Sequence, residues 1–232
     1  MAIALVKSAS GNNGGGATSV AATLSSSPVA GNFLVACIAA GSGPPASSVT
    51  STGASWSKAT GVFTGTVGSE IWYAENVSTG GATITANFSG SPEATIIVGE
   101  FSGVLLSASV DRVANAAADY SGSTPADSGT TAATSQADEI SIAGLMDKTL
   151  TGTWTTPTNS FTKLLEQKGG TSLNAVFAYK IVSVTGTQNT SVPRSPQPSS
   201  GPWVASIATF KAAAGGGGGG STGLLGLLGA GK

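Results

Sequence analysis

The sequence contains no histidine and only one cysteine, Cys37, in its 232 residues. Without histidine, the chain cannot form a Ser-His-Asp or Cys-His nucleophile system or a histidine-ligated zinc, copper or iron site. A single cysteine forms no intramolecular disulfide. Because Cys37 lies in the apolar run NFLVACIAA, we expect it to be an inert core residue. These absences predict a protein that is not an enzyme and has no cofactor.

Charged residues are also scarce. They make up 9% of the chain, the formal net charge is -1, and no basic cluster offers a footprint for nucleic acid. No apolar run reaches the roughly 18 residues of a membrane-spanning helix. Lys7 follows the first apolar residues, the reverse of the order in a secretory signal. We therefore expect a protein kept in the cytoplasm or assembled there, with no membrane or nucleic-acid partner and a neutral surface suited to crowded assembly.

Short apolar stretches alternate with turn-forming clusters such as GSGPPASS, STGG and SGSTPADSG. ATITANF alternates by twos, as a half-buried strand does, whereas FLVACIAA, ATIIVGEF and VASIATF are continuously apolar or small and suit central strands. No stretch before the C-terminal tail has convincing helical periodicity. The pattern predicts an all-β protein with a jelly-roll-like antiparallel β-sandwich.

Two segments, 29–103 and 135–213, carry similar landmarks in the same order. Asn32, Trp56, Ser78 and Phe101 match Asp138, Phe161, Ser183 and Phe210 at nearly constant spacing. This spacing favours two related halves, and the alternative is that all sandwich strands look alike. If the halves are related, we expect each to supply about four strands to one shared core.

The runs VAGNFLVACIAAG, SWSKAT, IWYAENVSTGGATITANFSG, IIVGEFSGV and WVASIATFKAA together resemble a broad group of phage and bacterial β-sandwich proteins. The resemblance covers about residues 2–214, and Asn32 replaces the acidic residue usual in that group. It implies a virion accessory protein of the decoration, head-fibre or tail type, or a carbohydrate-binding jelly roll. In the first case the partners are the major capsid protein or other virion proteins, and the subunit is a homo-oligomer, with a trimer as one option.

Carboxylates are the remaining acid/base candidates. A hydrolase would need two of them across a cleft, but we expect these side chains to lie in solvated turns. A calcium site formed by Asp119 and Asp127 fits no defined loop spacing, so we predict no metal. The carboxylates in or near predicted turns are Asp111, Asp119, Asp127, Asp138, Glu139 and Asp147.

Aromatic side chains offer another route to a ligand, because they can stack on sugars. Trp56, Trp72 and Trp203 sit at landmark strand positions, where we expect core packing. Trp154, in the segment LTGTWTTPTNS, is the best candidate for an exposed ligand-binding residue, and Tyr120 is the second. A glycan is the ligand that they would bind.

The C-terminal tail is distinct from the predicted sandwich, which comprises residues 1–214. Residues 215–220 are six glycines that predict a flexible linker, and residues 221–232 form an apolar peptide. Its leucines, Leu224, Leu225, Leu227 and Leu228, are the predicted partner-docking residues. The alternative origin of this tail is an engineered expression linker.

Overall fold

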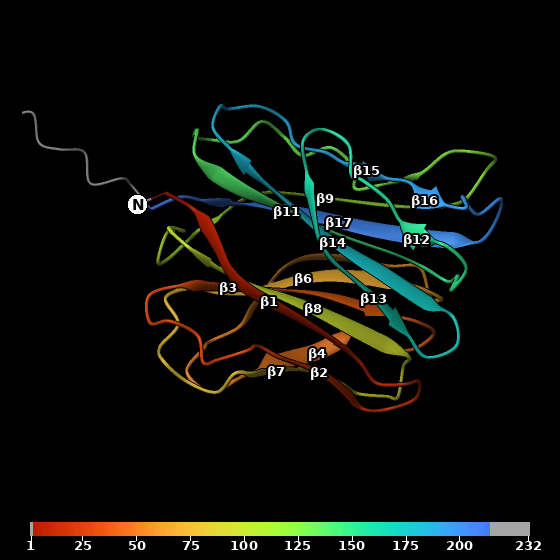
Figure 1. Ribbon diagram of the computed structural model, residues 1–232, viewed down its shortest axis with the longest axis horizontal. Coiled ribbons are helices and arrows are strands. Elements are labelled where there is room, and N and C mark those ends of the chain that lie inside the picture. Colours follow the sequence, from red (N-terminus) through yellow and green to blue (C-terminus); the bar gives the residue numbers. More distant parts are fainter. Residues whose placement is uncertain (1, 214–232) are drawn as a thin grey trace, which may run out of the picture.

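The computed structural model describes residues 2–213, and within them it contains strands and no helix. Every strand pair is antiparallel, and the sheets stack in layers (Figure 1). The prediction of an all-β antiparallel sandwich is confirmed.

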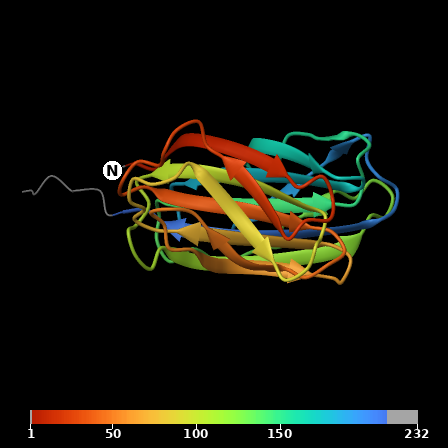
Figure 2. The same cartoon turned by 90° about the horizontal axis from the view of Figure 1, so that it is seen from below.

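The first half of the chain folds as one two-layer roll. Its larger sheet has the order β1-β8-β3-β6-β5, and its smaller sheet has the order β2-β7-β4. This pairing is that of an eight-stranded jelly roll, except that the fifth strand joins the larger sheet. Figure 2 views this roll from its outer side. The strands are β1 (Ala4–Asn12), β2 (Ser19–Thr23), β3 (Phe33–Ala40), β4 (Ala46–Thr50), β5 (Ser57–Phe63), β6 (Gly68–Ala74), β7 (Thr83–Phe88) and β8 (Ala94–Ser102).

The second half repeats this arrangement. Its larger sheet has the order β9-β17-β11-β14-β13, and a cover layer of two short pairs, β10-β15 and β12-β16, replaces the smaller sheet. Pro193, which has no N–H to donate, separates β15 from β16. The strands are β9 (Val110–Asp119), β10 (Ala126–Asp127), β11 (Glu139–Asp147), β12 (Thr153–Trp154), β13 (Thr162–Gly169), β14 (Leu173–Val182), β15 (Ser191–Val192), β16 (Arg194–Ser195) and β17 (Pro202–Lys211).

The two larger sheets stack face to face. β1 lies against β13 at one edge, and β5 lies against β9 at the other. Phe33 begins β3 and packs on Phe210, which pairs with Ile140 near the start of β11, so β3 and β11 run in the same direction. A twofold rotation axis parallel to the strands therefore relates the larger sheet of the first half to the larger sheet of the second half. The expectation of about four strands per half is wrong, because β1–β8 complete one roll and β9–β17 complete another.

Each layer boundary contains its own apolar core. Leu34, Ile38 and Ile84 lie inside the first roll. Phe33 and Phe210, whose ring centroids are 4.8 Å apart, lie between the two larger sheets. A strand between two cores has both faces buried, which explains the continuously apolar run of β3 and its complete burial. Cys37 is one of its buried residues, as predicted.

The two rolls approach closely where Gly144 of β11 faces Cys37 of β3. A Cβ atom at Gly144 would lie 3.1 Å from both Cβ and Sγ of Cys37. The Ser69 hydroxyl donates to the Gly144 carbonyl at 2.8 Å and fixes this contact. The central strands therefore need a glycine here.

Replacing Gly144 by alanine should lower the free energy of unfolding by about 1 to 3 kcal/mol, the usual cost of overpacking a dense core. Urea denaturation of the purified protein measures this loss. Gly186→Ala is the matched control, because a Cβ atom there meets nothing within 4 Å. Equal stabilities of the two variants would contradict the close packing of the rolls.

Candidate functional site

The first and last described residues lie at the same end of the molecule, which we call the terminal end. The Ala213 N–H donates to the Gly103 carbonyl at 2.8 Å, and the Ala212 N–H donates to the Asp138 carbonyl at 2.9 Å. Gly103 has a φ of 77°, and a Cβ atom there would lie 2.4 Å from the Ala2 carbonyl oxygen. Residues 212–213 are thus held against both halves and beside the N-terminal residues.

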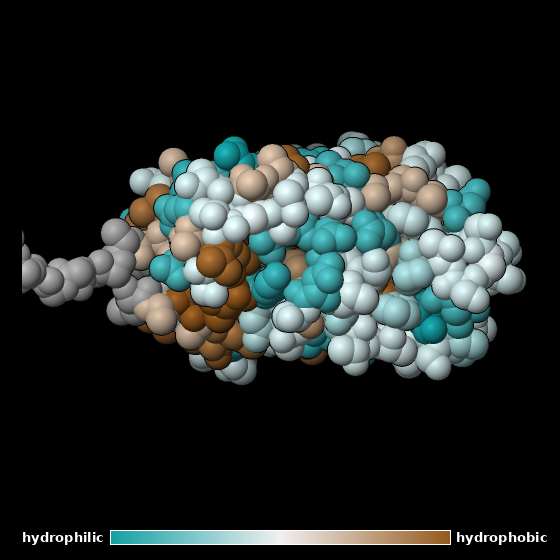
Figure 3. All heavy atoms as spheres, turned by 90° about the horizontal axis from the view of Figure 1, so that it is seen from above, coloured by the Kyte–Doolittle hydropathy of each residue, from teal (hydrophilic) through white to brown (hydrophobic). Residues whose placement is uncertain are grey.

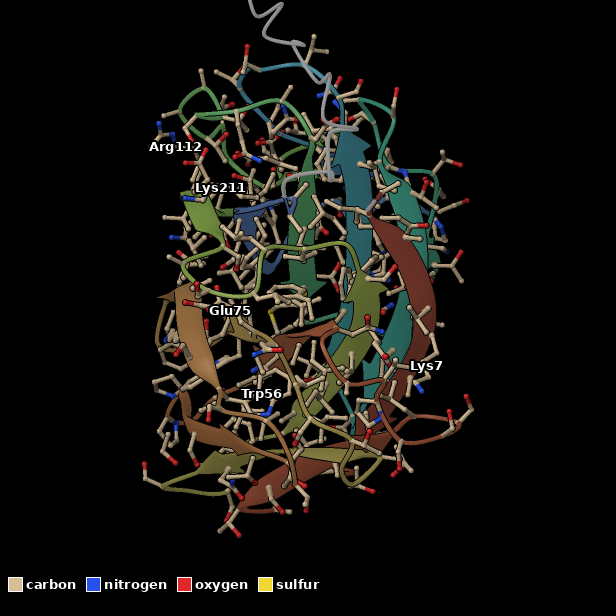
Figure 4. The ribbon with its side chains drawn as sticks, turned by 90° about the vertical axis from the view of Figure 1, so that its left-hand side faces the viewer. Lys7, Trp56, Glu75, Arg112 and Lys211 are labelled. Atoms are coloured by element: carbon tan, nitrogen blue, oxygen red, sulfur yellow. The ribbon has the colours of Figure 1, made fainter. Side chains whose placement is uncertain are left out.

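Charged side chains border the terminal end. Figure 4 looks onto it and shows Lys7 on one side and Arg112 and Lys211 on the other. The Glu75 carboxylate accepts a 2.6 Å hydrogen bond from the Ser109 N–H, which ties the β8–β9 connection to β6. Lys7 lies 3.2 Å from the buried Glu100 carboxylate. These contacts make the terminal end an ordered surface from which the chain continues.

Both predicted ligand-binding aromatics are buried, so the expectation of exposed stacking faces is wrong. The Trp154 side chain is 1% exposed and Tyr120 is 4% exposed. Trp154 Nε1 donates to Asn174 Oδ1 at 3.1 Å, and the Tyr120 hydroxyl donates to Asp147 Oδ2 at 2.8 Å. The segments that carry them belong to the cover layer of the second roll, whose inner side packs on the larger sheet.

The other tryptophans occupy core positions. Trp203 is buried in the second roll, whereas Trp56 and Trp72 are partly buried and pack against the core of the first roll. Trp56 Nε1 donates to the Ser51 hydroxyl at 2.9 Å. All three therefore support packing, in agreement with the prediction.

Arg194 is the centre of a buried polar cluster that the sequence did not reveal. Its guanidinium pairs with Asp147, donates to the Thr151 carbonyl and lies 4.8 Å from the centroid of the Trp154 ring. Burial and the Asp147 charge raise the pKa of Tyr120. The only signal in the sequence was a lone arginine between two prolines, in VPRSP. This cluster fastens the cover layer to β11.

Two carboxylates that were expected in solvated turns are instead buried at the ends of β11. Glu139 begins this strand, Asp147 ends it, and both are fully buried. Both lie on the face that carries Ala143 and Leu145, which the cover layer encloses. Burial first, and the nearby Asp111 carboxylate second, raise the pKa of Glu139 to about 7. Glu139 and Asp147 therefore lie inside the second roll and not in solvated turns.

Asp127 does not face an open site for calcium. Its Oδ1 accepts from the Gly129 N–H at 2.8 Å, and its Oδ2 accepts from the Ser191 hydroxyl at 2.7 Å. Asp119 is exposed at the end of β9. Within residues 2–213, no three His, Cys, Asp or Glu side chains come together in a metal-binding group.

A surface depression of about 380 Å³ borders the start of β13. It offers threonine hydroxyls and the Lys163 ammonium group, which already donates to the Trp154 carbonyl and lies 3.5 Å from Glu166 Oε2. Its lining residues are Thr155, Thr156, Pro157, Phe161, Thr162 and Lys163.

The predicted docking residues Leu224, Leu225, Leu227 and Leu228 lie outside the described residues, as does the glycine linker 215–220. In the part of the chain that the structure describes, no helix is long and apolar enough to cross a membrane. Comparisons with protein-family models, with curated proteins and with solved structures each gave no match.

Proposed function

We propose that this protein is a non-enzymatic structural subunit of a phage particle, of the capsid-decoration or head-fibre type, which attaches through its terminal segments. The supporting observation is that Ala2 and Ala213 lie together at the terminal end. Segments that leave from one end can engage one surface while the rest of the body projects from it. The partners would be the major capsid protein or other virion proteins, and several copies would bind side by side.

The doubled fold agrees with this role by analogy. Jelly rolls occur in viral capsid proteins and in lectins, so the fold suggests a class without fixing a role. The lectin-like alternative rested on Trp154 and Tyr120 as stacking surfaces, and both are buried. A tail-protein role remains the second candidate, because it uses the same end-on attachment.

Serine substitutions at Leu224, Leu225, Leu227 and Leu228 in the full chain should reduce the amount of protein on purified particles by at least tenfold. A leucine buried by a partner contributes about 1.5 to 3 kcal/mol, so losing several removes most of the attachment energy. Quantitative mass spectrometry of gradient-purified particles measures the bound copies. Electron cryomicroscopy of the same particles should show the terminal end facing the particle.

The matched control is the Ser221→Ala/Thr222→Ala variant, which changes the same tail without removing leucine. It should bind like the unaltered protein. Undiminished binding of the leucine variant would contradict attachment through this segment, and a body with its terminal end pointing outward would contradict the proposed orientation.

A further inference from the structure

Four large apolar side chains are exposed at one corner of the terminal end. They form what we call the corner patch: Leu5 (37% exposed), Val6 (43%), Ile181 (50%) and Val184 (72%). The space-filling view shows hydrophobic residues gathered at this end (Figure 3). Most of the remaining surface in that view is polar or neutral, so the concentration of apolar side chains marks a contact surface.

The strand registers place Leu5 and Ile181 near each other, and Val6 and Val184 follow them closely in the sequence. Leu5 pairs with Phe101 of β8, and the Phe101 ring contacts Tyr179 of β14 at a centroid distance of 5.4 Å. Ile181 follows Tyr179 on the same face of β14, because side chains two residues apart along a strand point the same way. The corner patch therefore continues the core between the two larger sheets out to the surface.

The chain leaves the described body close to this patch. Phe210 and Ile181 are both register partners of Ile140, one on each side of it. At a strand spacing of about 4.8 Å, these two residues are roughly 10 Å apart. Ala213 is only three residues beyond Phe210 and hydrogen-bonds to Gly103, beside Ala2 and Ile3.

The segment that follows has suitable chemistry and sufficient length. Ten residues separate Ala213 from Leu224, and six of them are consecutive glycines. A flexible chain of that length spans roughly 16 to 19 Å on average and about 35 Å when extended. Residues 221–232 carry one charged side chain, Lys232, at their far end. The four leucines can thus reach the patch without bringing a charge onto it.

We propose that the segment Leu224–Leu228 docks on the corner patch of its own chain in the isolated protein. The tether keeps the segment at a high effective concentration beside the patch, so a small apolar contact suffices. This intramolecular contact covers two apolar surfaces at once in the free subunit. It concerns the isolated chain and does not depend on the proposed role in a particle.

A nitroxide label on a Ser221→Cys variant tests this contact. Cys37 is buried, so the unsubstituted native protein should take up no label and serves as the labelling control. In methyl-labelled full-length protein, the nitroxide should abolish the signals of Val6, Ile181 and Val184, and reduction of the nitroxide should restore them. The comparison residue is Leu106, which is 49% exposed and follows Leu105, whose N–H donates to the Lys211 carbonyl.

Selective loss of the corner-patch methyl signals, with the Leu106 signal largely retained, supports docking. Serine substitutions at the four leucines should then remove the selectivity. Equal broadening of Leu106 and Ile181, or unchanged selectivity in the serine variant, would overturn the proposal. A mixture of isotope-labelled protein without nitroxide and nitroxide-labelled protein without isotopes tests whether the segment docks on a second copy instead. Selective loss of the corner-patch methyl signals in that mixture would overturn docking within one chain. If the protein shows this contact but does not bind particles, that result contradicts only the proposed function.

Discussion

Replacing Arg194 by methionine should lower the free energy of unfolding by about 3 to 5 kcal/mol, because it leaves the Asp147 carboxylate buried without its cation. Both side chains are fully enclosed, and the same guanidinium satisfies the Thr151 carbonyl and stacks on Trp154. Guanidinium chloride denaturation, followed by tryptophan fluorescence, measures this loss. The Trp154 environment in the native state should change as well.

Arg112→Met is the matched control, since Arg112 lies 3.8 Å from Asp111 with a side chain that is 39% exposed. Because the Arg112 guanidinium is partly solvated and its contact with Asp111 is long, this pair contributes about 1 kcal/mol or less. The double variant Arg194→Met/Asp147→Asn should recover part of the loss, because it removes the unpaired charge while an amide oxygen can still accept from Tyr120. Similar losses for Arg194→Met and Arg112→Met would show that the buried cluster does not hold the cover layer.

The unaltered protein should lose stability as the pH rises from about 4.5 to about 7, and replacing Glu139 by glutamine should abolish this loss. Burial raises the pKa of this carboxyl from 4.5 to about 7 in the folded state. Between these values the folded protein keeps a proton that the unfolded chain has released, so the free energy of unfolding falls with rising pH. The full effect is on the order of 3 kcal/mol.

Urea denaturation at several pH values between 4.5 and 8 tests this prediction. Near pH 4.5 the Glu139→Gln variant and the unaltered protein should have similar stability, because both carry a neutral side chain at this position. Above pH 7 the variant should be more stable. Asp119→Asn, at an exposed carboxylate, is the control and should retain the pH dependence. A pH dependence that persists in Glu139→Gln would assign it to another group.

Central strands were predictable from the sequence, whereas polar edge strands were not. FLVACIAA and VASIATF are continuously apolar or small, and β3 and β17 are indeed buried on both sides. By contrast, β4 (Ala46–Thr50) lies partly inside the cluster GSGPPASS that was interpreted as a turn. β5 (Ser57–Phe63) has no alternating pattern and pairs with one neighbour, β6. Edge strands of this kind need only backbone pairing, which leaves little trace in the side chains.

The candidate site shows where local sequence patterns fail. Trp154 and Tyr120 stand among threonines, serines and glycines, which predicts an exposed loop. Their burial depends on a tertiary feature, the packing of short segments as a cover layer over β11 and β17. Glu139 and Asp147 similarly follow and precede polar residues, yet the strand alternation turns both inward. Only the layer arrangement distinguishes these positions from solvated turns.

If the protein attaches through its terminal end, as we propose, the same-end placement of Ala2 and Ala213 also determines where foreign sequence can be inserted without obstructing that attachment. The β1–β2 turn lies opposite, and Gly14 and Gly16 have open space around them. A peptide epitope grafted there would point away from the terminal end, and therefore away from the proposed attachment surface.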